Sequence, residues 1–158
     1  MQNLLNQLKQ PEENVKIQQR IYPGDNLKLN VAYRNINSLD VSIYKSKTTE
    51  TLYDKKDELQ FSDLRKVATR IKDYSFKWNE RQDYATKDTV INIHTSEVGN
   101  YYLVVKNSVV PFTVTRLYLL HRVLPDNLKE VVILDSKSGK PVEGVNVTCW
   151  KSGTDNKN

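Results

Sequence analysis

Cysteine is almost absent from this chain, since Cys149 is the one thiol among 158 residues. A single cysteine excludes an intrachain disulfide framework and a metal site built from several thiolates. Long apolar runs are missing too, because no stretch approaches the roughly 20 apolar residues of a membrane-spanning helix. The opening residues, Met1 to Leu5, lack the basic and apolar regions of a signal peptide.

Glycine and histidine are too few and too scattered for most catalytic motifs. Five glycines are spread through turns, and neither a phosphate-binding glycine loop nor a Gly-x-Ser-x-Gly elbow occurs. The two histidines, His94 and His121, lie in separate strand-like runs, whereas histidine catalysis needs a partner within hydrogen-bond reach. We therefore expect a protein that is not an enzyme, with no catalytic residue and no cofactor.

Charged residues are plentiful but are not arranged as a binding site. The acidic residues Asp54, Asp57 and Glu58 lack the ordered ligand series and glycine turn of a calcium loop, so we expect solvation and no metal. The net charge is +5, yet between Lys45 and Asp73 basic residues are interleaved with acidic ones. That interleaving favours a mixed-charge solvated face over a nucleic-acid-binding stripe.

The residues that are abundant are strand formers. Nine tyrosines accompany many Val, Ile and Thr residues, while alanine is scarce. With 38% hydrophobic and 27% charged residues, the chain has enough apolar material for a core. We expect an all-β fold, an antiparallel sandwich of the immunoglobulin or fibronectin-III type, preceded by a short helix around Leu4, Leu5 and Leu8 that ends before Pro11.

Alternation of apolar and polar residues predicts the strands. Leu27 to Tyr33 and Leu39 to Ile43 are joined by a short polar turn, which predicts an antiparallel hairpin. The stretch from Ser46 to Ser62 has no period and is predicted to be a long loop.

Beyond that loop the apolar positions change parity. Val67, Thr69 and Ile71 share one parity, whereas Tyr74, Phe76 and Trp78 have the other, so a bulge near Lys72 and Asp73 is expected. The aromatic residues Tyr74, Phe76, Trp78 and Tyr84 are expected in the core, with a sugar or peptide platform as the alternative.

A second change of parity marks a domain boundary. Val110, Phe112 and Val114 are followed by Leu117, Leu119 and Val123 on the opposite parity, which places the boundary between Thr115 and Leu117. We expect residues 1–13 to be a helix or linker, 14–116 a sandwich and 117–158 the start of another one. In that last unit, the apolar run 131–134, the turn 136–140 and the alternating Val145, Val147 and Cys149 are too few strands to close a sandwich.

Three stretches resemble the macroglobulin-like domains of bacterial alpha-2-macroglobulin family proteins, particularly the large Bacteroidetes forms. They are Tyr22-Pro23-Gly24-Asp25 continuing to Tyr44, Val98 to Val105 with a Gly-x-Tyr-x-Leu pattern, and Phe112 to Val147. The third is the most specific, because Ser138-Gly139-Lys140-Pro141-Val142 and Gly144-Val145-Asn146-Val147 are similar to the start of a new macroglobulin domain. A Gly-Lys-Pro-Val turn also occurs in other surface-protein repeats.

The resemblance implies a non-catalytic structural module of a large protease-trapping protein, that is, an endopeptidase inhibitor. Its partners would be neighbouring macroglobulin domains and, through the whole protein, proteases, with no nucleic acid and no membrane span. The parent would be periplasmic or at the cell surface, with an export signal outside this segment. The family's thioester pattern is absent, because Cys149 is followed by Trp150 and Lys151. Asn146-Val147-Thr148 is a formal glycosylation acceptor that a bacterial protein would usually leave unused.

An unrelated surface adhesion or peptide- or glycan-binding sandwich is the alternative, and it predicts an exposed aromatic patch. Either way, residues 117–158 are expected to leave strand edges and apolar side chains uncovered, which favours self-association through this segment.

Overall fold

The computed structural model describes residues 6, 8–48, 61–78 and 83–148 of the chain. The fold divides into two compact units, residues 1–116 and residues 117–158. The division falls where the apolar residues change parity, between β8 (Ser108–Val114) and β9 (Leu117–Val123). Each unit is described by itself below.

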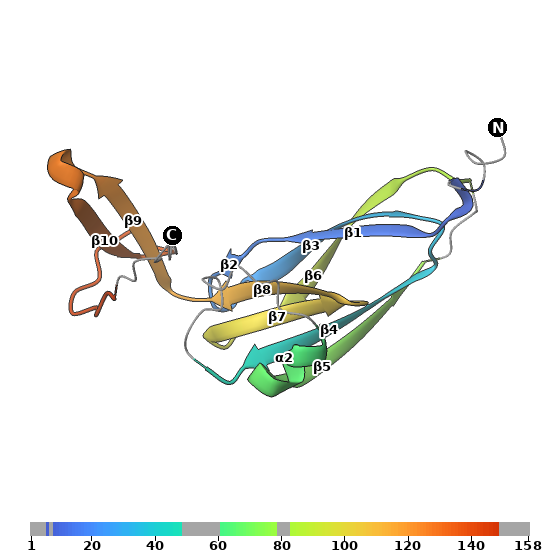
Figure 1. The fold of residues 1–158 in the computed structure, drawn as a ribbon, viewed down its shortest axis with the longest axis horizontal. Helices are drawn as coiled ribbons and strands as arrows, with labels where there is room; N and C mark the ends of the chain where they lie inside the picture. Colours follow the sequence, from blue (N-terminus) through green and yellow to red (C-terminus); the bar gives the residue numbers. More distant parts are fainter. Residues whose placement is uncertain (1–5, 7, 49–60, 79–82, 149–158) are drawn as a thin grey trace, which may run out of the picture. The chain divides into compact units, whose positions relative to one another are not determined.

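The first unit is an antiparallel β-sandwich (Figure 1). One sheet has the order β1-β3-β6, formed by Glu12–Ile17, Asn26–Arg34 and Lys87–His94. The other has the order β2-β8-β7-β4-β5, in which β2 is Arg20–Ile21, β7 is Gly99–Val105, β4 is Ser38–Ser46 and β5 is Ala68–Lys77. The expected all-β, immunoglobulin-like sandwich is confirmed.

The first strand segment contributes to both sheets. β1 runs antiparallel to β3, and two residues later β2 pairs parallel with β8, with Arg20 opposite Thr113 and Ile21 opposite Val114. The backbone N–H of Thr113 also donates to Gln19 O at 2.8 Å. Because the chain passes from one sheet to the other between β1 and β2, a single continuous segment forms an edge strand of both sheets.

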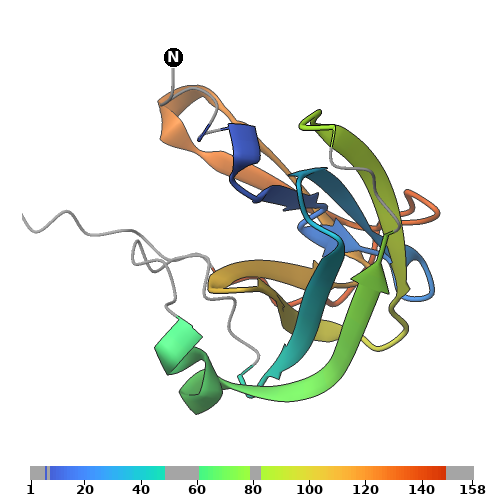
Figure 2. The same ribbon diagram turned by 90° about the vertical axis from the view of Figure 1, so that its right-hand side faces the viewer.

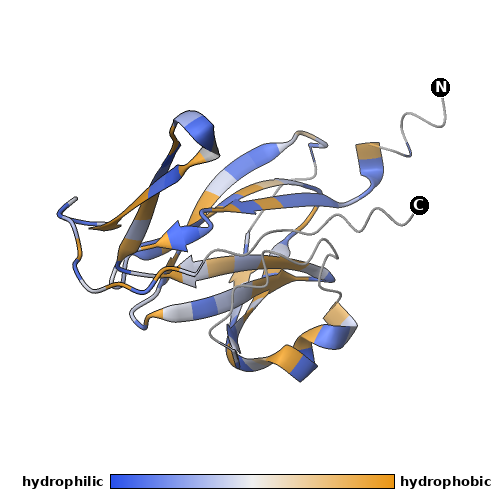
Figure 3. Ribbon diagram, turned by 60° about the vertical axis from the view of Figure 1, so that its left-hand side comes forward, coloured by the Kyte–Doolittle hydropathy of each residue, from blue (hydrophilic) through white to orange (hydrophobic). Residues whose placement is uncertain are grey.

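The core lies between the two sheets and follows the alternation seen in the sequence (Figure 3). Leu27, Leu29, Val31 and Tyr33 point inward from β3, and Leu39, Val41 and Ile43 do so from β4. The other strands of the two sheets, β6, β7 and β8, add Ile91, Ile93, Tyr101, Leu103, Val105, Phe112 and Val114. Period-2 burial is what an interior shared by two sheets requires.

The predicted hairpin between residues 27–33 and 39–43 is wrong. β3 pairs with β1 and β6, whereas β4 pairs with β5 and β7, so the two strands belong to different sheets. The connection turns at Asn35, which has a φ of 55°. Asparagine tolerates this left-handed conformation better than most residues. Alternation alone predicts two half-buried strands, but it cannot distinguish a hairpin from a crossing between layers.

The predicted loop 46–62 is also corrected where the structure describes it. Residues 49–60 lie outside the described part, but Phe61–Val67 form a helix, α2, that leads directly into β5 (Figure 2). Leu64 of α2 is fully buried in a second apolar cluster with Tyr44, Ala68, Tyr102 and Val104, and Phe61, Val67 and Val109 pack at its margin. The helix thus covers the outer face of the larger sheet.

The expected change of register in β5 is present, one residue before the predicted position. Ile43 lies opposite Lys72, while Tyr44 lies opposite Arg70, so Ile71 is the extra residue of a bulge. The predicted grouping of Val67, Thr69 and Ile71 on one strand face is wrong, because Val67 ends the helix and Ile71 is 51% exposed. After the bulge, Tyr74, Phe76 and Trp78 return to the core, as expected.

The second unit is built on a two-stranded antiparallel sheet. β9 pairs with β10 (Lys129–Asp135) from Leu117 opposite Asp135 to Val123 opposite Lys129, and the 3-10 turn Pro125–Asn127 (η2) joins them. Beyond β10, Pro141 makes a single bridge to Leu134. The expected strand at Val145 and Val147 is not formed, and Cys149 lies outside the described residues.

Candidate interaction surface

A tyrosine near the start of β7 fixes the connection between the two sheets. The hydroxyl of Tyr101 donates to the backbone oxygen of Glu97 at 2.9 Å, while its ring stacks on Phe112 with centroids 5.3 Å apart. Lys45 Nζ donates to the Glu97 carboxylate at 2.6 Å and lies 6.0 Å from the centroid of the tyrosine ring. This is the tyrosine corner of immunoglobulin-like sandwiches.

Ionisable groups around this corner have shifted pKa values. Burial raises the pKa of Tyr101 above its ordinary value of 10.0. The hydrogen bond to Glu97 raises the pKa of Lys45, and the same bond lowers the pKa of Glu97. Each shift favours the protonation state found at neutral pH, in which the hydrogen bonds of the corner are formed.

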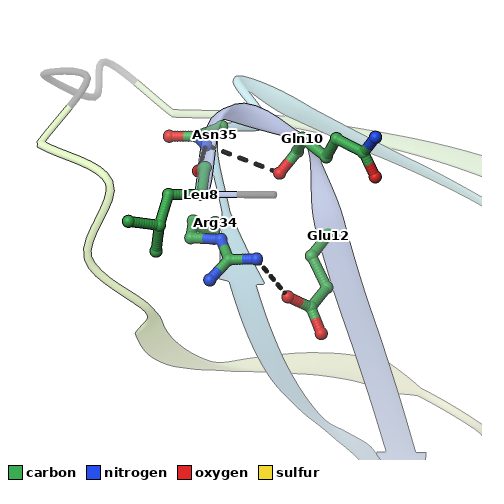
Figure 4. A network of polar contacts seen from close by, with 5 residues as sticks. All are labelled: Leu8, Gln10, Glu12, Arg34 and Asn35. Carbon is green, nitrogen blue, oxygen red and sulfur yellow. Dashed lines mark hydrogen bonds and ion pairs between the residues drawn. The ribbon is translucent and has the colours of Figure 1, made fainter. Parts of the chain in front are cut away.

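The opposite end of the sandwich ties down the chain that enters it (Figure 4). Asn35 Nδ2 donates to the backbone oxygen of Leu8 at 2.7 Å and to that of Gln10 at 3.5 Å. Arg34 donates to Glu12 at 2.7 Å. The polar connection between β3 and β4 therefore holds the segment before β1, in which Asn6, Leu8 and Lys9 are helical.

The two histidines do not form a site. His94 ends β6 opposite Asn26, and His121 lies in β9 opposite Val131, each exposed and each in a different unit. Among the described residues, no group of three His, Cys, Asp or Glu side chains is placed to hold a metal ion. Asp54, Asp57, Glu58 and Trp150 lie outside the described residues.

The aromatic group does not form an exposed platform. Tyr74, Phe76 and Trp78 are partly buried against the core, where Trp78 stacks on Tyr33 with ring centroids 4.8 Å apart. Tyr84 differs from its expected core position, because it is 42% exposed and adopts a φ of 58°. Tyr84 lies beyond the end of β5, in the connection to β6 rather than in a strand.

The β9–β10 hairpin exposes apolar side chains on both of its faces. Residues directly opposite each other in an antiparallel pair point to the same face. One face carries Leu117, Leu119, Val123, Val131 and Ile133, and the other carries Tyr118, Leu120, Val132 and Leu134. Every β9 side chain is exposed. Strands that are apolar on both faces are typical of sheets covered on both sides.

A turn stabilised by Asp135 follows the hairpin. Asp135 Oδ1 accepts from the N–H of Lys137 and Ser138, at 3.2 and 2.8 Å, and from the Ser138 hydroxyl at 2.8 Å. Gly139 has a φ of 68°, and its N–H donates to Asp135 O at 2.9 Å. This geometry explains the Asp-x-x-Ser-Gly spacing, because the carboxylate orders the turn and glycine allows the left-handed backbone.

Comparisons with known proteins add little. No family model and no curated protein matches this sequence. Among solved structures, the sulfur carrier protein SoxY from Chlorobium limicola f thiosulfatophilum is similar over 65% of this chain and 78% of that chain, at 14% identity and a TM-score of 0.31. In the part of the chain that the structure describes, no helix is long and apolar enough to cross a membrane.

Proposed function

We propose that this chain is a non-catalytic structural and interaction module of a large alpha-2-macroglobulin-like, protease-trapping protein. It acts by packing against neighbouring domains, and its parent is periplasmic or at the cell surface. The observation that carries the proposal is the junction at residue 116. There, one sandwich ends at Val114 and a new apolar strand begins at Leu117, after only two intervening residues.

Two further features support a structural rather than a chemical role. The Asp135 to Gly139 turn belongs to the stretch whose sequence is most similar to the family's domain start. The ionisable cluster at Lys45, Glu97 and Tyr101 fixes a strand connection.

The test uses the native protein recovered from its host with an antibody raised against residues 14–116. We expect a polypeptide far larger than the 18.4 kDa of this chain. After addition of a broad-specificity protease, we expect limited cleavage and retention of the protease by the complex. A catalytically dead protease serves as the control, since it cannot trigger trapping. A native protein of about this chain's own mass, or one that never retains an active protease, would overturn the proposal.

A further inference from the structure

We infer that the outer face of the three-stranded sheet binds an acidic polysaccharide, a glycan chain in which some sugars carry uronic acid carboxylates. This inference goes beyond the proposed function and does not depend on it. It rests on the residues of β1, β3 and β6 that point away from the core, and on their exposure, their amide groups and their charges.

The strand registers show which residues share this outer face. Residues directly opposite each other in antiparallel strands point to the same side, and the buried residues of β3 and β6 point to the core side. The central rows across the outer face are Lys16 with Asn30 and Val90, Lys28 with Asn92, Asn26 with His94, and Asn14 with Ala32 and Asp88. All of these residues except Ala32 are exposed.

The two sheets of the sandwich use their outer faces differently. On the larger sheet, Tyr44, Tyr102 and Val104 are buried in the cluster that α2 covers. On the smaller sheet, the outward positions are polar, and the large apolar residue among them is Val90. A sheet face in water needs only to be hydrophilic, so the choice of polar residues is the informative feature.

Four of the outward residues are asparagine, a residue that is depleted in β-strands. They are Asn14 in β1, Asn26 and Asn30 in β3, and Asn92 in β6. Within the described part of the chain, no side-chain hydrogen bond occupies their amides. Threonine would suit a merely solvated strand better, so the amides point to a ligand that pairs with them. Each amide has donors and an acceptor, which match the hydroxyl groups of sugars.

Two lysines supply positive charge among these amides. Lys16 is opposite Asn30, so Lys28 is its diagonal neighbour on the adjacent strand, about 7–8 Å away. Neither lysine has a carboxylate partner among the described residues, whereas Arg34 on the same face is paired with Glu12. Two like charges at this spacing repel each other, and a ligand carboxylate that approaches both ammonium groups replaces repulsion by attraction.

The balance of groups selects among anionic ligands. None of the outward positions of β1, β3 and β6 is Tyr, Trp or Phe, so this face lacks the stacking platform that binds single-stranded nucleic acids. Nucleic acids also carry a charge on every phosphate, whereas here the amides outnumber the two lysines, and Asp88 lies on the same face. A ligand with many hydroxyl groups and few carboxylates fits this composition, and an acidic polysaccharide is such a ligand.

A charge test uses the full chain and polygalacturonate as the probe, with binding measured by isothermal titration calorimetry. We expect saturable binding of polygalacturonate, none of neutral dextran, and weaker binding of poly-L-glutamate and of oligodeoxythymidine. K16Q/K28Q should weaken the binding of polygalacturonate about tenfold or more, because two charge-assisted contacts are lost. K72Q/K77Q is the matched control, since it removes the same charge from exposed positions of β5 in the larger sheet and should change binding little.

An amide test separates recognition from net charge. N30T/N92T leaves the charge of the chain unchanged and replaces two amides by a better strand former. We expect binding of polygalacturonate to weaken about fivefold or more, while the urea concentration at the unfolding midpoint stays the same or rises. N37T/N146T removes two exposed amides that lie outside this sheet, and it should leave binding unchanged.

Four results would overturn the inference. The first is a natural chain that does not bind polygalacturonate, and the second is equal weakening by K16Q/K28Q and K72Q/K77Q, which would show attraction by net charge alone. The third is full binding by N30T/N92T. The fourth is tighter binding of poly-L-glutamate or oligodeoxythymidine than of polygalacturonate, which would assign the face to an acidic protein or a nucleic acid. Far-ultraviolet circular dichroism of each variant confirms that the sandwich remains folded.

Discussion

At the scale of single residues, Tyr101 has the most specific role in the sandwich. Its ring fills the core beside Phe112, and its hydroxyl reaches the backbone of Glu97. Y101F keeps the ring and removes one hydrogen bond, so the free energy of unfolding should fall by about 1 kcal/mol in chemical denaturation. Y118F changes an exposed tyrosine of the hairpin and serves as the control. Equal effects of the two substitutions would contradict the structural role of the corner.

The same residues predict how stability depends on pH. Burial raises the pKa values of Tyr101 and Tyr102, and the bond to Glu97 raises that of Lys45. A group with a raised folded-state pKa stabilises the fold below its unfolded-state pKa and loses that contribution as pH rises. The denaturant concentration at the unfolding midpoint should therefore decrease as the pH rises above about 10. This decrease should be less steep for Y101F than for the natural chain. A midpoint that rises through this range would contradict the assignment.

At the scale of elements, α2 covers a face that would otherwise be exposed to solvent. Leu64 is fully buried against the outer face of the larger sheet, whereas the adjacent Arg65 is exposed. L64A should lower the free energy of unfolding by about 2 to 3 kcal/mol, because a buried leucine is replaced by a cavity. R65A should change it by less than about 0.5 kcal/mol. Comparable values for the two variants in urea denaturation would show that α2 is not docked.

This helix also shows where sequence reasoning failed and why. Phe61, Leu64 and Val67 have helical spacing, and β7 is apolar at Tyr102 and Val104 as well as at the core positions. Together these signals predict a helix over that strand. On its own, a seven-residue segment inside a charged stretch is too short to show a helical period that distinguishes it from a loop.

Strand existence was predictable, but strand partnership was not. Alternation located β3 and β4 because a strand between core and solvent must alternate. The bulge in β5 was predictable for the same reason, since the aromatics had to recover the core parity after Ile71. Pairing depends on contacts between distant residues, so the crossing at Asn35 left no trace in local periodicity.

At the scale of the whole molecule, the chain combines a sandwich with a hairpin in which every β9 side chain is exposed. The sandwich encloses one main core between its sheets and a second cluster beneath α2. The two histidines lie in different units. The exposed apolar side chains of β9 are in keeping with the proposed role as a structural and interaction module.

Amide hydrogen exchange of the full chain tests this division most directly. We predict slow exchange in β3, β4 and β7, because these strands are central to the sandwich. In β9, whose side chains are all exposed, we predict much faster exchange. Exchange in β9 as slow as in β3, β4 and β7 would contradict a chain made of a closed sandwich and an exposed hairpin.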